Sequence, residues 1–267
     1  MSGLLGRAET SSIPLEEIRF GVILNGGVSL AVWMGGAVME LDRLTKAGKQ
    51  PAATASQPGP PNVYAALLAL AGSTARADVI AGTSAGGING AALALSQVNP
   101  DAPLGLLRDI WVDQGRIEAL MRQPFRGSPT SLLQGDEFFL PQLNTALGLL
   151  AAPGAGWRPP AQAPIDLSIT TTVLRGNQRV SIDSMGQPLL QSIHGARFHW
   201  QRLPTTPPAQ DPFSVEAVER TAHRLALASR STASFPIAFE PSFVPVNSPM
   251  HPEPGRDMLL TDAQRLR

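Results

Sequence analysis

The chain has 267 residues, of which 43% are hydrophobic and 16% charged, and its formal net charge is zero. This length and composition suit one α/β domain with a sizeable core, and the neutral balance excludes the basic surface that nucleic-acid binding requires. The absence of cysteine excludes disulfides, thiolate metal sites and a cysteine nucleophile. The N-terminus lacks a basic head followed by an apolar run, so we expect no secretory signal.

The first part of the chain predicts strands that alternate with helices. Residues 19–24 (RFGVIL) form an apolar run that is typical of a buried parallel strand, and residues 28–47 continue as a helix. Residues 63–71 predict a second helix, and residues 77–81 (ADVIA) a second buried strand that leads into a helix over residues 84–97. This order predicts an α/β fold with a central, mainly parallel sheet flanked by helices.

The second part predicts further helices and strands between proline-rich loops. We expect helices over residues 103–150, interrupted at 124–129, and over residues 214–229; strands are expected at residues 165–172, 178–183 and 197–201. Loops are expected at residues 50–62, 151–164 and 234–252, which are rich in proline. We therefore predict an N-terminal tail over residues 1–18 and one domain over residues 19–267.

Residues 82–86 (GTSAG) carry the pattern Gly-x-Ser-x-Gly between a predicted strand and a predicted helix. In this context the pattern forms a sharp turn that exposes the serine, and the flanking glycines, Gly82 and Gly86, avoid clashes. The start of the following helix places partial positive charge and free N–H groups near the serine. Ser84 is therefore our candidate nucleophile; the alternative is a glycine-rich helix start that packs against the sheet.

Asn25, Gly26 and Gly27 follow the first predicted strand and can expose consecutive backbone N–H groups to an anion. One interpretation is an oxyanion hole, and a second is a phosphate-binding loop, although neither GxGxxG nor a Walker motif is present. A simple tight turn is the third. Residues 20–39 contain no charged residue, but the glycines in their middle favour strand, loop and helix over a membrane span.

Three segments together resemble the patatin-like phospholipase family, and most closely a bacterial, actinobacterial-type branch of it. Residues 24–31 (LNGGVSLA) with 33–36 (WMGG) resemble the family's oxyanion loop, and residues 81–90 (AGTSAGGING) its nucleophile turn. Residues 228–236 (ASRSTASFP) are similar to the block that precedes the family's catalytic aspartate. The order of the three segments is that of the family, which implies a three-layer architecture.

The resemblance implies a serine lipid acyl hydrolase of the phospholipase A or lysophospholipase type, with a Ser-Asp dyad and an acyl-enzyme. Ser84 would be the nucleophile, and the N–H groups of Gly26, Gly27 and Val28 would bind the oxyanion. No cofactor or metal is implied. The expected partner is a phospholipid or another acyl lipid, reached by transient contact with a membrane surface, and the expected location is cytoplasmic.

The sequence departs from the family pattern at the base, because it contains no Asp-Gly dipeptide. Asp262 and Asp257 are the candidates within the chain, and we expect the family's aspartate to lie beyond Arg267. The loop also has Val28 and Leu30 where the family usually has a third glycine and an arginine. His223 and His251 are outside candidates for a triad base. A catalytically inactive lipid-binding protein and a nucleotide- or phosphate-binding protein remain the alternative functions.

Overall fold

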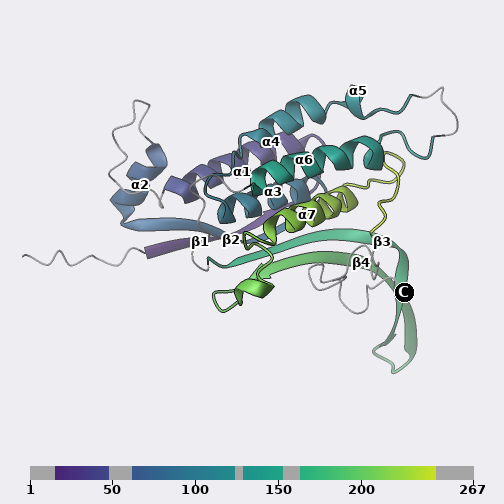
Figure 1. Cartoon of the computed structure of the whole chain (residues 1–267). Helices are drawn as coiled ribbons and strands as arrows, with labels where there is room; N and C mark the ends of the chain where they lie inside the picture. The colour runs from purple at the N-terminus through teal and green to yellow at the C-terminus, as the bar shows by residue number, and fades with distance from the viewer. Residues whose placement is uncertain (1–15, 48–61, 124–128, 153–162, 245–267) are drawn as a thin grey trace, which may run out of the picture.

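A four-stranded sheet forms the base of the structure, a computed structural model that describes residues 16–47, 62–123, 129–152 and 163–244 (Figure 1). Its strands are β1 (Glu16–Leu24), β2 (Ser73–Thr83), β3 (Ile165–Ile182) and β4 (Pro188–Arg202), in that spatial order. β1 and β3 both pair in parallel with β2, whereas β4 pairs antiparallel with β3. The expected central, mainly parallel sheet is confirmed.

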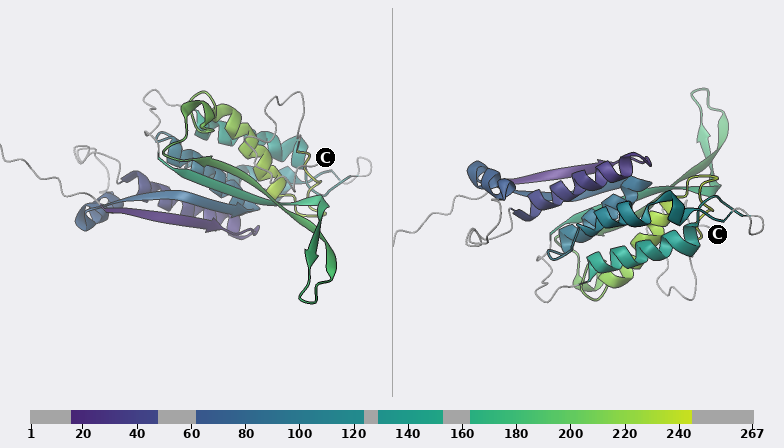
Figure 2. Two further views of the ribbon diagram at one scale, coloured as in Figure 1. Left: turned by 90° about the horizontal axis from the view of Figure 1, so that it is seen from below. Right: turned by 90° about the horizontal axis from the view of Figure 1, so that it is seen from above.

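Four longer helices lie on one face of this sheet (Figures 1 and 2). They are α1 (Leu30–Ala47), α3 (Ala85–Val98), α6 (Leu140–Ala151) and α7 (Val218–Thr232). The shorter described helical elements are α2 (Val63–Ala71), α4 (Leu106–Asp109), η2 (Ile110–Gln114), α5 (Ile117–Leu120), η3 (Gly135–Phe139) and η4 (Pro208–Gln210). No described helix has both the length and the apolar character needed to cross a bilayer.

Helix α3 occupies the centre of the fold because small residues let it approach the sheet closely. All of its residues are buried, and a Cβ at Gly90 would lie only 3.2 Å from Ile80 Cγ2 of β2. In β3, Ile165, Leu167 and Ile169 alternate with polar residues and are buried in the main core. The core therefore lies between the sheet and its single helical layer.

The opposite face of the sheet is open over the described residues. Ile23 and Val79 are exposed there, and Asp166 of β3 pairs with His199 of β4 on the polar side of the same strands. The described residues thus build the sheet and one helical layer, and the third layer of the expected architecture is not among them.

The main departure from the expected elements is the hairpin of β3 and β4, which extends beyond the body of the fold (Figure 1). The separate strands expected at 165–172 and 178–183 are one strand, whose register with β4 shifts between Thr172 and Asn177. β4 also begins nine residues before the strand expected at 197–201. β1 starts at Glu16, so the last residues of the expected tail 1–18 are strand, and α7 ends at Thr232 rather than at 229.

Candidate active site

Ser84 is the single residue that connects the end of β2 at Thr83 to the start of α3 at Ala85. Its backbone has φ 55° and ψ −127°, a combination that costs a non-glycine residue about 1–3 kcal/mol. The N–H groups of Gly87 and Ile88 donate to the Ser84 carbonyl oxygen, which anchors the turn to the first turn of α3. The strained turn holds the half-buried serine at the carboxyl edge of the sheet, as the Gly-x-Ser-x-Gly pattern predicts.

The glycine loop after β1 lies directly against this turn. A Cβ at Gly26 would be 2.8 Å from Ser84 Cβ and 3.5 Å from Ser84 Oγ, so only a glycine leaves room beside the serine. Gly27 has φ 143°, which L side chains rarely adopt. Among the described residues, the N–H groups of Gly26, Gly27 and Val28 have no hydrogen-bond acceptor. The arrangement offers free donors next to the hydroxyl, as an oxyanion hole requires.

The end of α7 contacts the serine turn as well. The Ser84 N–H donates to Thr232 Oγ1 at 2.7 Å, and this hydroxyl in turn donates to the Thr170 carbonyl oxygen of β3. A Cβ added to Gly87 would lie only 2.7 Å from Thr232 Cγ2, so Thr232 packs closely against the start of α3. The three segments that carry the family resemblance therefore meet at Ser84, although they are far apart in the sequence.

Asn89 fixes the helix that follows the glycine loop. Its side-chain amide donates to the Ala31 carbonyl oxygen at 3.1 Å, and its Oδ1 accepts a hydrogen bond from Trp111 Nε1 at 3.0 Å. The side chain is fully buried, so both contacts form away from water. Asn89 thereby ties the start of α1 to α3, on which the serine turn stands.

The described residues bring no base to the serine hydroxyl. Among the described residues, no side chain hydrogen-bonds to Ser84 Oγ. Asp257, Asp262 and His251 lie outside the described residues. His223 bonds to Asn144 Oδ1 between α7 and α6, away from the serine turn. A role for Asp262 as base remains a prediction.

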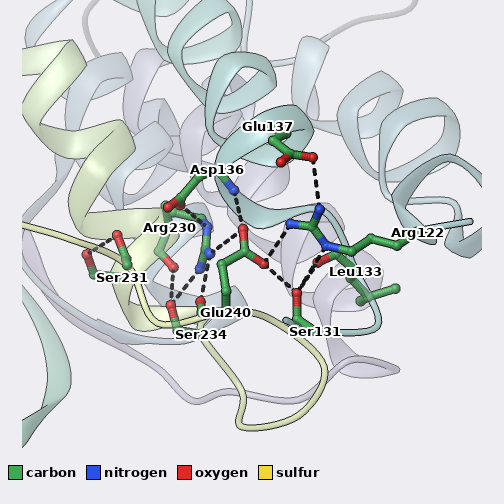
Figure 3. Close-up of polar contacts among 10 residues, drawn as sticks. Arg122, Ser131, Leu133, Asp136, Glu137, Arg230, Ser231, Ser234 and Glu240 are labelled. Carbon is green, nitrogen blue, oxygen red and sulfur yellow. Dashed lines mark hydrogen bonds and ion pairs between the residues drawn. The ribbon is translucent and has the colours of Figure 1, made fainter. Parts of the chain in front are cut away.

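A charged cluster at the other side of α7's last turn joins Arg230, Glu240 and Arg122, and no sequence motif predicted it (Figure 3). Arg230 is fully buried, and its Nη2 lies 3.3 Å from Glu240 Oε1. Burial alone would raise the pKa of Glu240, but hydrogen bonds from Ser131 Oγ and the Asp136 N–H, with the positive charge of Arg230, lower it to about 2. Glu240 is therefore ionised across the physiological range.

The substitution Thr232→Val should isolate the contribution of the hydroxyl on the serine turn. Valine keeps the shape of threonine but leaves the Ser84 N–H and the Thr170 carbonyl without this partner. We expect a loss of about 1–3 kcal/mol in the free energy of unfolding, measured by urea titration. Thr145→Val, which removes an exposed hydroxyl bonded to Pro141, should change stability by less than about 0.5 kcal/mol. Equal losses in both variants would contradict a special role for Thr232.

Comparison with known proteins gives two matches. Residues 62–158 match the family model described as patatin-like phospholipase. A curated protein of Mycobacterium tuberculosis (strain ATCC 25618 / H37Rv), "Uncharacterized membrane protein Rv3479", is 37% identical over 245 residues, which are 86% of this chain and 21% of that protein. The chain thus spans about a fifth of the relative's length. No solved structure matches the chain.

Proposed function

Because residues 62–158 match the patatin-like phospholipase family model, we propose that the chain hydrolyses fatty acyl esters of lipids with Ser84 as the nucleophile. The observation that carries the proposal is the strained serine turn with the free N–H groups of the glycine loop beside it. A nucleotide- or phosphate-binding protein would use the glycine loop, but it would have no use for a serine held at φ 55°. The acyl hydrolase accounts for both features.

In the proposed reaction, Ser84 Oγ attacks the ester carbonyl while a base accepts its proton. The carbonyl oxygen becomes an oxyanion, which the N–H groups of Gly26, Gly27 and Val28 stabilise by about 3 kcal/mol for each well-placed donor. The intermediate then expels the alcohol, which takes up the proton, and leaves an acyl-enzyme. Water, activated by the same base, attacks this ester and releases the fatty acid.

The base of the proposed dyad is an aspartate outside the described residues. Asp262 is the candidate within the chain, since it follows the block at residues 228–236 in the order that the family resemblance implies. A serine without its base is nearly inert, because such groups act as a unit. Asp262→Asn therefore tests whether Asp262 or another aspartate is the base. If the substitution abolishes the reactivity of Ser84, Asp262 is the base of the dyad.

The substrate is proposed to be a phospholipid or another acyl lipid taken from a membrane surface on the cytoplasmic side. Two observations support contact with lipid. Val28 and Trp33, beside the glycine loop and at the start of α1, are 95% and 71% exposed, so they present large apolar side chains to the solvent next to the site. The relative from Mycobacterium tuberculosis is itself described as a membrane protein. The specific class, phospholipase A or lysophospholipase, is part of the same proposal.

Labelling with a fluorophosphonate probe tests the proposal directly, because only an activated serine reacts. We expect a single label on the wild-type chain, mapped to Ser84 by peptide mass spectrometry, together with release of fatty acid from phospholipid vesicles. Ser84→Ala should abolish both signals while the unfolding transition is retained. Ser29→Ala, in the exposed glycine loop, should leave the labelling in place.

The absence of a base at Ser84 Oγ within the described residues favours one alternative, a catalytically inactive lipid-binding protein. That protein would bind fatty acid or vesicles without labelling or hydrolysis. A folded wild-type chain that resists the probe and retains lipid binding would establish this alternative and overturn the hydrolase.

A further inference from the structure

The segment after α7, residues 233–240, runs from the serine turn to the charged cluster. Leu132 and Leu133 donate backbone hydrogen bonds to the carbonyl oxygens of Ile237 and Ala238, at 3.1 Å and 2.8 Å. Ile237 has φ 73°, a left-handed conformation that is a true outlier for a β-branched residue. Such strain persists only where the surrounding contacts enforce it.

Glu240 supplies those contacts, because its carboxylate and its carbonyl oxygen are both engaged (Figure 3). Oε1 accepts the Asp136 N–H at 2.7 Å, and Oε2 accepts Ser131 Oγ at 2.6 Å and lies 3.4 Å from Arg122 Nη2. The Glu240 carbonyl oxygen accepts a hydrogen bond from Arg230 Nη2 at 2.8 Å. One residue thus ties the end of the segment to three other parts of the chain.

Arg230 carries this connection back to α7. Its Nη1 donates to Ser234 Oγ at 2.6 Å, its Nε lies 3.0 Å from Asp136 Oδ1, and its guanidinium lies over the Phe239 ring. Arg230 and Thr232 occupy the last turn of the same helix, and Thr232 holds the Ser84 N–H. Between the two anchors, the segment presents Phe235 and Ile237, which are 71% and 80% exposed.

We propose that Glu240 is a positioning residue of the Ser84 site, because through Arg230 it sets the end of α7 against the serine turn. Glu240 also holds the exposed side chains of Phe235 and Ile237, which form the rim of the site, where they contact the acyl chain of the substrate. The part of this inference that concerns the acyl chain rests on the proposed hydrolase function. The part that concerns the serine turn does not, since it follows from the contacts alone. Two measurements therefore address the two parts separately.

The experiment compares Glu240→Gln with Glu137→Gln. Both substitutions remove one negative charge that faces Arg122, but Glu137 is exposed and has no contact with Arg230. Hydrogen exchange, followed by mass spectrometry, should show exchange about tenfold faster in Glu240→Gln for peptides that cover residues 82–88 and 231–239. Peptides from the core of α3, and all peptides of Glu137→Gln, should exchange as in the wild type.

The second measurement is the ratio of kcat/KM for p-nitrophenyl decanoate to that for the butyrate. We expect Glu240→Gln to lower this ratio about tenfold, since a displaced rim loses contacts that only the longer chain makes. A merely structural role would lower the active fraction, and hence both values equally, so the ratio would not move. Glu137→Gln should keep the wild-type ratio.

Local exchange and a selectivity ratio that both match the wild type in Glu240→Gln would overturn the inference. If the wild type hydrolyses neither ester, the hydrolase proposal fails, and the exchange data alone decide whether Glu240 positions the serine turn. If Glu240→Gln does not fold, Ser131→Ala takes its place, because it removes the hydroxyl that contacts Glu240 Oε2, together with its contacts to Arg122 Nε and the Leu133 carbonyl oxygen. The same two outcomes then apply to Ser131→Ala, with smaller changes expected.

Discussion

Alanine at position 86 is expected to prevent the chain from reaching its native fold. An ideal Cβ on Gly86 would lie 2.0 Å from the Leu24 carbonyl oxygen and 2.5 Å from its carbonyl carbon. Both atoms belong to the backbone of β1, where Leu24 pairs with Gly82 of β2, so relief of the clash requires the two strands to separate. We expect a loss of more than about 4 kcal/mol in the free energy of unfolding, seen as insoluble expression or as a lost urea transition.

Gly148→Ala is the matched control for this substitution. Gly148 lies within α6, and an added Cβ there would meet no atom within 4 Å. Alanine favours a helix interior over glycine by about 1 kcal/mol, so this variant should unfold at a higher urea concentration than the wild type. A Gly86→Ala variant that folds with wild-type stability would show that the strand end is not packed against the serine turn as described.

The sequence predicted the elements that local patterns determine. The helix over residues 63–71 has the bounds of α2, since Asn62 caps its start and Gly72 adopts the left-handed conformation after its end. The strands at 19–24 and 77–81 were located by their apolar runs, but both extend further toward the N-terminus in the structure. The expectation that 19–24 is a buried strand was wrong, because β1 lies at the edge of the described sheet and none of its residues is fully buried. The extensions are held by strand pairing, which a local pattern does not reveal.

The long hairpin could not be predicted for the same reason. The strands expected at 165–172 and 178–183 left a break at residues 173–177 between them. In the structure this stretch forms an irregularity in β3, and pairing with β4 carries the strand through it to Ile182. Cross-strand hydrogen bonds thus hold together what the local pattern divides into two strands.

At the site, the short motifs predicted the residues that meet, but not what holds them together. Ser84 and the glycine loop were recognisable because glycine spacing reports a backbone geometry. The hydrogen bond from the Ser84 N–H to Thr232 joins residues 148 positions apart, and Glu240 and Arg122 are further partners from distant segments. No local signal marks such pairs, because their side chains are ordinary polar residues in the sequence.

Arg230→Met should cost about 3–5 kcal/mol of the free energy of unfolding near neutral pH. Methionine keeps much of the apolar stem but removes a fully buried guanidinium, which leaves the Glu240 carboxylate without its 3.3 Å partner. Arg108→Met is the control, since Arg108 and Asp109 form an exposed pair whose loss should change stability by less than about 0.5 kcal/mol. Equal losses in the two variants, measured by urea titration, would contradict the importance of the buried pair.

The free energy of unfolding of Arg230→Met should also depend less on pH than that of the wild type. The folded-state pKa of Glu240 is about 2, below its ordinary value of 4.5, so its stabilising contribution is complete above about pH 4.5 and is lost as the pH falls toward 2. This loss amounts to about 3 kcal/mol in the wild type. Arg230→Met lacks one of the charges that lower this pKa and should lose less over the same window. The stability gap between wild type and variant, followed by urea titration from about pH 7 to about pH 3, should therefore narrow with acid. A constant gap would mean that Arg230 stabilises the fold without acting through the ionised Glu240.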